Sequence, residues 1–137
     1  VMGAIKSLQA LGKNLQATTH ASVVFYSTVA VQTGMPFHAS VAAAKGALEG
    51  LPRSLAAEWA PKIRVNCIAP SLVNTPLADK FLNNEAKMEK AGERHPLQRV
   101  GTAKEIAEAT AYLLSEKSGW MTGQIIQIDG GIGTLKT

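Results

Sequence analysis

The stretch His38-Ala39-Ser40-Val41-Ala42-Ala43-Ala44-Lys45-Gly46-Ala47-Leu48 decides how the rest of this 137-residue chain is interpreted. It begins a run rich in alanine and leucine that predicts a helix from about Ser40 to Ala60. Residues four positions apart share one face of a helix, so Val41 and Lys45 should lie side by side. Short runs of β-branched and aromatic residues before and after the helix predict strands at Ser22 to Ser27 and Arg64 to Ala69.

A third strand is predicted at Gln124 to Ile128, again bounded by turn and loop residues. The order strand, helix, strand, with more than about a dozen residues between strands, favours parallel pairing. Such alternation is typical of α/β proteins with a doubly wound sheet. We therefore predict about three parallel strands with flanking helices.

Local signals indicate where further helices start. Thr102-Ala103-Lys104-Glu105 has the spacing of a capping box. Thr75 followed by Pro76 predicts a cap and first helical position for a helix from Leu77 to about Gly92. Pro52 should kink the long helix after Lys45, because proline cannot donate to the carbonyl of Leu48.

The amino-terminal residues follow an amphipathic helical pattern without a capping residue ahead of it. Its apolar positions are Ile5, Leu8, Leu11 and Leu15. The chain is therefore interpreted as opening within a helix.

Composition predicts one globular domain. Hydrophobic residues make up 46% of the chain and charged residues 18%, which argues against disorder. No apolar run approaches the roughly 20 residues of a membrane span. The single cysteine, Cys67, lies in an apolar run and is interpreted as a small buried residue. These features predict a soluble chain in a reducing compartment, here the cytoplasm.

The net charge of +4 does not by itself indicate nucleic-acid binding. Basic and acidic residues alternate between positions 79 and 94, as on a solvated helix face. Aromatic residues are few and are not interleaved with basic ones, as stacking on bases would require. We expect neither a nucleic-acid partner nor a metal site.

Three further stretches accompany the one quoted first. They are Lys62-Ile63-Arg64-Val65-Asn66 leading into Ala69-Pro70, His95-Pro96-Leu97 with Arg99-Val100-Gly101, and Met121-Thr122-Gly123-Gln124 with Asp129-Gly130-Gly131. In order and spacing they resemble the short-chain dehydrogenase/reductase (SDR) family. The resemblance covers only the carboxyl-terminal half of such an enzyme, because no glycine-rich dinucleotide turn is present. It implies that residues 1–137 form a single partial Rossmann-like domain.

The resemblance also implies the roles of three positions. The family's catalytic tyrosine, which gives or takes the alcohol proton, corresponds to Val41. The lysine that holds the nicotinamide ribose corresponds to Lys45, and the serine that orients the substrate carbonyl corresponds to Thr28. Valine has no proton to offer, and a positioned acid or base typically supplies about 100- to 10,000-fold in rate.

The segment from Pro70 to Thr75 resembles the family's proline-glycine loop. There, backbone groups at Val73 would meet the nicotinamide carboxamide, and Thr75 would lie near the nicotinamide or pyrophosphate. Pro70, Val73, Thr75 and Lys45 are thus the expected contacts of NAD or NADP. Ser71 stands where the family has the glycine of this loop. If that position requires a positive φ, the serine would be strained there.

Two other residues are candidates for the missing proton donor. Tyr26 carries a phenol, but strand alternation puts it on the same face as Thr28, so a packed aromatic is the favoured interpretation. His38 lies in the loop before the helix and could transfer a proton, although a loop histidine is more often only solvated.

The leading hypothesis is an NAD(P)-dependent oxidoreductase of alcohols and carbonyls that is impaired or inactive in this chain. Its substrate lid would be Leu77 to His95. The alternative is a non-catalytic assembly module that retains the fold. For both, the family implies a homo-oligomer, a dimer or tetramer, with the first helix and the helix after Lys45 at the subunit interface.

Overall fold

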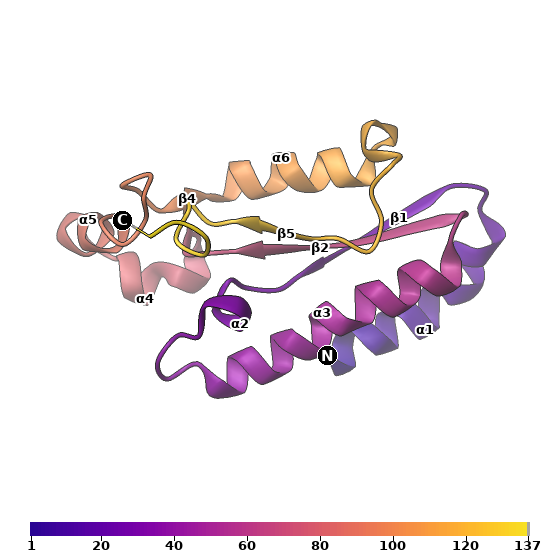
Figure 1. The fold of residues 1–137 in the computed structure, drawn as a ribbon, viewed down its shortest axis with the longest axis horizontal. Helices are drawn as coiled ribbons and strands as arrows, with labels where there is room; N and C mark the ends of the chain where they lie inside the picture. Colours follow the sequence, from indigo (N-terminus) through magenta and orange to yellow (C-terminus); the bar gives the residue numbers. More distant parts are fainter. Residues whose placement is uncertain (137) are drawn as a thin grey trace.

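The computed structural model describes residues 1–136, which form an α/β fold (Figure 1). The main elements in chain order are α1 (Met2–Ala17), β1 (Ala21–Tyr26), α2 (Ala30–Thr33), α3 (Ala39–Trp59), β2 (Ile63–Pro70), β3 (Val73–Asn74), α4 (Asp79–Leu82), α5 (Glu85–Gly92), β4 (Gly101–Thr102), α6 (Ala103–Leu114) and β5 (Ile125–Ile128). Two 3₁₀ turns, η1 (Pro76–Ala78) and η2 (Glu116–Ser118), precede α4 and follow α6.

Three parallel strands in the order β1-β2-β5 form the main sheet. Helices α1 and α3 cover one face of this sheet and α6 covers the other (Figure 1). A separate two-stranded sheet pairs β3 with β4. The predicted strands agree with the observed ones to within one residue at each end, and the predicted Rossmann-like α/β class is confirmed.

The core lies between the main sheet and helices α1 and α3. Its fully enclosed side chains come from the two adjacent strands and from α3: Phe25, Ala56, Ile63, Val65 and Cys67. The central strand β2 is buried along most of its length, and this includes Asn66, whose side chain donates to the Met121 carbonyl at 2.9 Å. Burial, with a further contribution from the charge of Glu49, raises the pKa of the Cys67 thiol to about 11. Cys67 is therefore a packing residue, as predicted.

Helix α3 continues through Pro52 from Ala39 to Trp59. Pro52 is fully buried, although it cannot donate a hydrogen bond to Leu48. The helix does not end there, and a kink at this position stays a prediction.

The prediction of one helix from Leu77 to about Gly92 is wrong. The segment is divided into η1, α4 and α5. Thr75 occupies the expected cap position, but its hydroxyl donates to the carbonyl of Val73 (3.4 Å) and caps no helix. Asn84 starts α5 instead, since its side-chain oxygen accepts the backbone N–H of Lys87 at 2.9 Å.

The predicted capping box at the start of α6 is confirmed. The Thr102 hydroxyl accepts the backbone N–H of Glu105, and the Glu105 carboxylate accepts the backbone N–H of Thr102. Within residues 1–136, no helix has both the length and the hydropathy that crossing a bilayer requires. The same residues hold no group of three or more histidine, cysteine, aspartate or glutamate side chains placed to bind a metal ion.

Candidate functional site

A cleft of 610 Å³ opens at the carboxyl end of the main sheet. Its walls come from the segments after β1 and β2, the loop before α3, and helices α4 and α5. The lining residues are Thr28, Val29, Ala30, Met35, Pro36, His38, Ser71, Leu72, Phe81, Lys87, Lys90, Ala91, Arg94, His95 and Ile132. Ligands of open parallel sheets bind outside the carboxyl ends of the strands, so this cleft is the candidate active site.

Thr28 and His38 both line the cleft. The Thr28 hydroxyl oxygen lies 3.3 Å from the backbone nitrogen of Ala30, from which it accepts. The Nδ1 atom of His38 lies 2.7 Å from the carbonyl oxygen of Pro36. Since a carbonyl can only accept, Nδ1 carries the proton, and Nε2 of the neutral ring is left as an acceptor. A hydroxyl and an imidazole thus face the same space.

Lys45 lies one turn after Val41 on α3 and reaches back to the end of β1. Its ammonium nitrogen donates to the Tyr26 carbonyl at 2.8 Å, which leaves two N–H groups for other partners. Val41 is 43% exposed on the first turn of α3. The structure confirms the helical i, i+4 spacing of the two side chains.

Tyr26 does not contribute to the cleft. Its hydroxyl lies 2.7 Å from the Thr110 hydroxyl of α6, the helix on the other face of the sheet from α3 (Figure 1). Strand alternation does not extend to Thr28, because β1 ends at Tyr26. Tyr26 is therefore bound to α6 but is 43% exposed, so it is not the packed aromatic that the sequence favoured, and its hydroxyl points away from the cleft.

The predicted cofactor contacts of the proline loop lie along the segment that leaves β2. Pro70 ends that strand and accepts the backbone N–H of Val29 at 3.1 Å. Val73 pairs with Gly101, and Thr75 lines a small open pocket with Asn74. Of the predicted site residues, Thr28 lines the cleft, whereas Lys45, Pro70, Val73 and Thr75 lie outside its lining.

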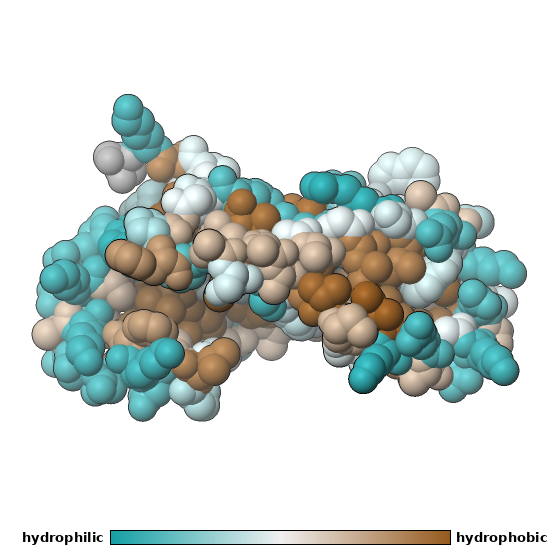
Figure 2. All heavy atoms as spheres, turned by 90° about the horizontal axis from the view of Figure 1, so that it is seen from below, coloured by the Kyte–Doolittle hydropathy of each residue, from teal (hydrophilic) through white to brown (hydrophobic). Residues whose placement is uncertain are grey.

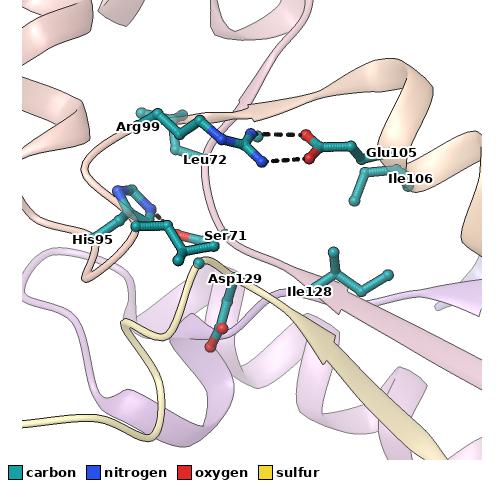
Figure 3. A pocket seen from close by; sticks show the side chains of 11 residues that line it. Ser71, Leu72, His95, Arg99, Glu105, Ile106, Ile128 and Asp129 are labelled. Atoms are coloured by element: carbon teal, nitrogen blue, oxygen red, sulfur yellow. Dashed lines mark hydrogen bonds and ion pairs between the residues drawn. The ribbon is translucent and has the colours of Figure 1, made fainter.

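Ser71 follows β2 and is bound to the buried residue His95 (Figure 3). The Ser71 hydroxyl lies 2.8 Å from Nε2 of His95, and Nδ1 lies 2.9 Å from the carbonyl oxygen of Ala91. Nδ1 must therefore carry the proton, and the Ser71 hydroxyl donates to Nε2. In the described chain the non-glycine residues with positive φ are Phe37 and Gln98. The strain considered for serine in place of glycine is thus not present.

Sequence reasoning missed a buried carboxylate one turn after Lys45. Glu49 is 6% exposed, and its carboxylate accepts the Ser27 hydroxyl at 2.6 Å and the Gln32 side-chain amide at 3.5 Å. Gln32 in turn accepts from Gln127, which ties α2 to β5. The available signal was a glutamate four residues after Lys45, in the middle of an alanine- and leucine-rich helix.

The family model described as "Enoyl-(Acyl carrier protein) reductase" matches residues 1–133, nearly the whole chain. The chain belongs to the short-chain dehydrogenase/reductase family. This SDR chain is 36% identical over its full length to a peroxisomal 2,4-dienoyl-CoA reductase of Saccharomyces cerevisiae, of which it covers 47%. It is 40% identical to a tropinone reductase homologue of Arabidopsis thaliana, over 85% of the chain and 45% of that relative.

Solved SDR structures share the fold. A gluconate 5-dehydrogenase from Burkholderia cenocepacia, in complex with NADP and tartrate, superposes with a TM-score of 0.85. It is 28% identical and covers 94% of the SDR chain described here, which in turn covers 51% of that structure. The chain thus spans about half the length of the proteins it matches.

Proposed function

We propose that this SDR chain forms the substrate-side part of an NAD(P)-dependent oxidoreductase that converts alcohols and carbonyls and lacks the usual proton donor. The observation that carries the proposal is Val41 one helical turn before Lys45, beside a cleft lined by Thr28. The Thr28 hydroxyl can donate to a substrate carbonyl, as the serine in this position does in the family. Hydride transfer would then proceed slowly, because no side chain replaces the tyrosine in full.

The residues present fit the nicotinamide end of NAD or NADP. Lys45 has two unused N–H groups at the carboxyl end of β1, where parallel sheets bind such ligands. Lys45 would hold the ribose, and the backbone of Val73 with Pro70 and Thr75 would hold the nicotinamide end. When bound, the cofactor supplies or accepts a hydride.

Other features complete the proposal. The segment from Leu77 to His95 would serve as the substrate lid, since α4 and α5 form one wall of the cleft. His38 is the candidate for residual proton transfer, because Pro36 binds only its Nδ1 atom and leaves Nε2 for a substrate. Placement in the cytoplasm, homo-oligomerisation and the single partial domain of residues 1–137 stay part of the proposal.

The direct test is to restore the tyrosine in the full-length protein with Val41→Tyr. Reduction of a panel of ketones with NADH or NADPH should accelerate by about 100-fold or more, the usual contribution of a positioned acid. His38→Ala should lower the residual rate of the wild type and leave the rate of Val41→Tyr nearly unchanged. Wild-type turnover at the level of Val41→Tyr would contradict the proposed impairment.

A second candidate is a non-catalytic assembly module. The surface of α1 and α3 favours it, because Leu11, Val41 and Met2 are exposed there, and Figure 2 shows hydrophobic residues gathered over this side of the molecule. Titration with NADPH, followed by nicotinamide fluorescence, separates the two functions. Binding that Lys45→Ala weakens supports the oxidoreductase, and absence of binding in both proteins supports the module.

A further inference from the structure

Helix α5 and the residues just after it carry opposite charges on opposite sides. With 3.6 residues per turn, positions i, i+3 and i+7 fall on one stripe of a helix. Lys87, Lys90 and Arg94 have that spacing. The acidic residues of the segment, Glu85, Glu89 and Glu93, follow their own stripe at i, i+4 and i+8. The charges that look interleaved in the sequence are therefore separated in space.

The basic stripe, and not the acidic one, lines the candidate active-site cleft. Lys87, Lys90 and Arg94 all belong to the cleft wall, and among the described residues that line it none is acidic. In Figure 2, hydrophilic residues gather over the end of the molecule that carries α4 and α5, next to hydrophobic ones. All three cations of the segment thus line the cleft, and none of its three glutamates does.

Other elements bring a hydroxyl and an imidazole to the same cleft. Thr28 and His38 lie there, and apolar side chains such as Val29 and Met35 complete the walls. The cleft volume of 610 Å³ suits a small molecule rather than a macromolecule. A ligand that spans the cleft would thus have one end at the Thr28 hydroxyl and the other at the basic stripe.

We propose that the substrate is an anionic alcohol or ketone, whose carboxylate or phosphate binds Lys87, Lys90 and Arg94 while its reacting oxygen lies at Thr28. This inference rests on the proposed function only for the reacting end; the anion site stands on the charges of the cleft. Lys87 is already oriented, because its ammonium donates to the Asn83 side-chain oxygen at 2.9 Å. Arg94 can bind a carboxylate or phosphate with two parallel hydrogen bonds.

Binding to the full-length protein without cofactor tests the anion site directly. Calorimetric titrations would compare two matched pairs of probes, acetoacetate with methyl acetoacetate, and dihydroxyacetone phosphate with dihydroxyacetone. We expect the charged member of at least one pair to bind about ten-fold more tightly, and this preference to shrink as salt screens the exposed cations. The pair that shows the preference identifies the anion as carboxylate or phosphate.

Two triple variants separate the cleft from the overall charge. Lys87→Gln, Lys90→Gln and Arg94→Gln together should abolish the preference. Lys6→Gln, Lys13→Gln and Lys117→Gln remove the same charge from exposed positions outside the cleft, and should preserve it. Equal or undetectable binding of both members in both pairs, or a preference that survives in the cleft variant, would overturn the inference. If the wild-type protein prefers the charged probe but binds neither NADH nor NADPH, the result would support the anion site and overturn the proposed function instead.

Discussion

Glu49 shows how one residue can join helix α3 to the segment that leaves strand β1. Its carboxylate is buried in α3 and accepts the hydroxyl of Ser27, the residue directly before Thr28. The same turn of helix carries Lys45, whose ammonium binds the backbone of Tyr26. Two polar contacts one helical turn apart thus fix the start of the loop that brings Thr28 into the cleft.

Replacing Glu49 should therefore destabilise the protein. Glu49→Ala removes the close acceptor of the buried Ser27 hydroxyl and leaves it only the Lys45 carbonyl oxygen at 3.5 Å, so we expect the free energy of unfolding to fall by about 1–3 kcal/mol. Glu49→Gln retains an acceptor and should cost less. Urea denaturation measures both, with Glu58→Ala, an exposed position of the same helix, as the control expected to change stability by less than about 0.5 kcal/mol. A Glu49→Ala protein as stable as that control would show that the contact is not stabilising.

Glu105 should contribute to the pH dependence of stability. The hydrogen bond from Arg99, assisted by the backbone N–H and hydroxyl of Thr102, lowers the pKa of its carboxyl to about 2 (Figure 3). Because the folded-state pKa lies below the unfolded value, this stabilisation is complete above about pH 4.5 and is lost as the pH falls toward 2.

The melting temperature measured between pH 6 and pH 2.5 tests this expectation. The wild type should lose more of its stability over this range than Glu105→Gln, which has no proton to take up at this position. Glu108→Gln is the control, since Glu108 is exposed and lies 3.8 Å from Lys104. Identical pH profiles for wild type and Glu105→Gln would contradict the prediction.

At the scale of elements, the division of the lid segment depends on a single cap. Asn84 starts α5 by accepting the backbone N–H of Lys87, and α5 presents the basic stripe to the cleft. Loss of an asparagine cap typically costs about 1 kcal/mol. The position of the three cations therefore depends on a residue that itself lies outside the cleft lining.

Asn84→Ala should lower the free energy of unfolding by about 1 kcal/mol and increase hydrogen exchange along α5. Asn83→Ala is the matched neighbour, since the Asn83 side-chain oxygen accepts from the side chains of Lys87 and Asn84 and caps no backbone N–H of α5. Hydrogen exchange resolved by peptide separates the two variants. Equal protection of α5 in both would show that Asn84 is not the cap that holds the helix.

At the scale of the whole molecule, the strands of the sheet were easier to predict than the points at which a helical segment is interrupted. The strands of the main sheet follow from short β-branched and aromatic runs, because these differ clearly from the alanine- and leucine-rich helix between them. The division of the segment from Leu77 to Gly92 was not predicted, because Thr75-Pro76 has the pattern of a helix start and the cap at Asn84 was not recognised. The contacts of Glu49 with Ser27 and of His95 with Ser71 join residues 22 and 24 positions apart, and sequence spacing alone does not pair them.

The apolar side formed by α1 and α3 leads to a prediction about assembly. Both helices cover the core on their inner faces, yet Met2 and Leu11 remain exposed, and Ala42, Ala43 and Ala44 allow close approach of another helix. A second copy packed on this side would remove that apolar surface from water at about 25 cal/mol per Å². We therefore expect the full-length protein to be a dimer or tetramer.

Leu11→Glu should shift the oligomer toward a monomer, because the interface would then have to bury an unpaired carboxylate. Light scattering over a range of concentrations measures the mass of both proteins. Leu135→Glu is the control, since Leu135 is equally an exposed leucine but lies beyond β5, away from α1 and α3. A wild type that stays monomeric at every concentration would refute assembly through this side, whereas dissociation caused by Leu11→Glu alone would locate the interface on α1 and α3.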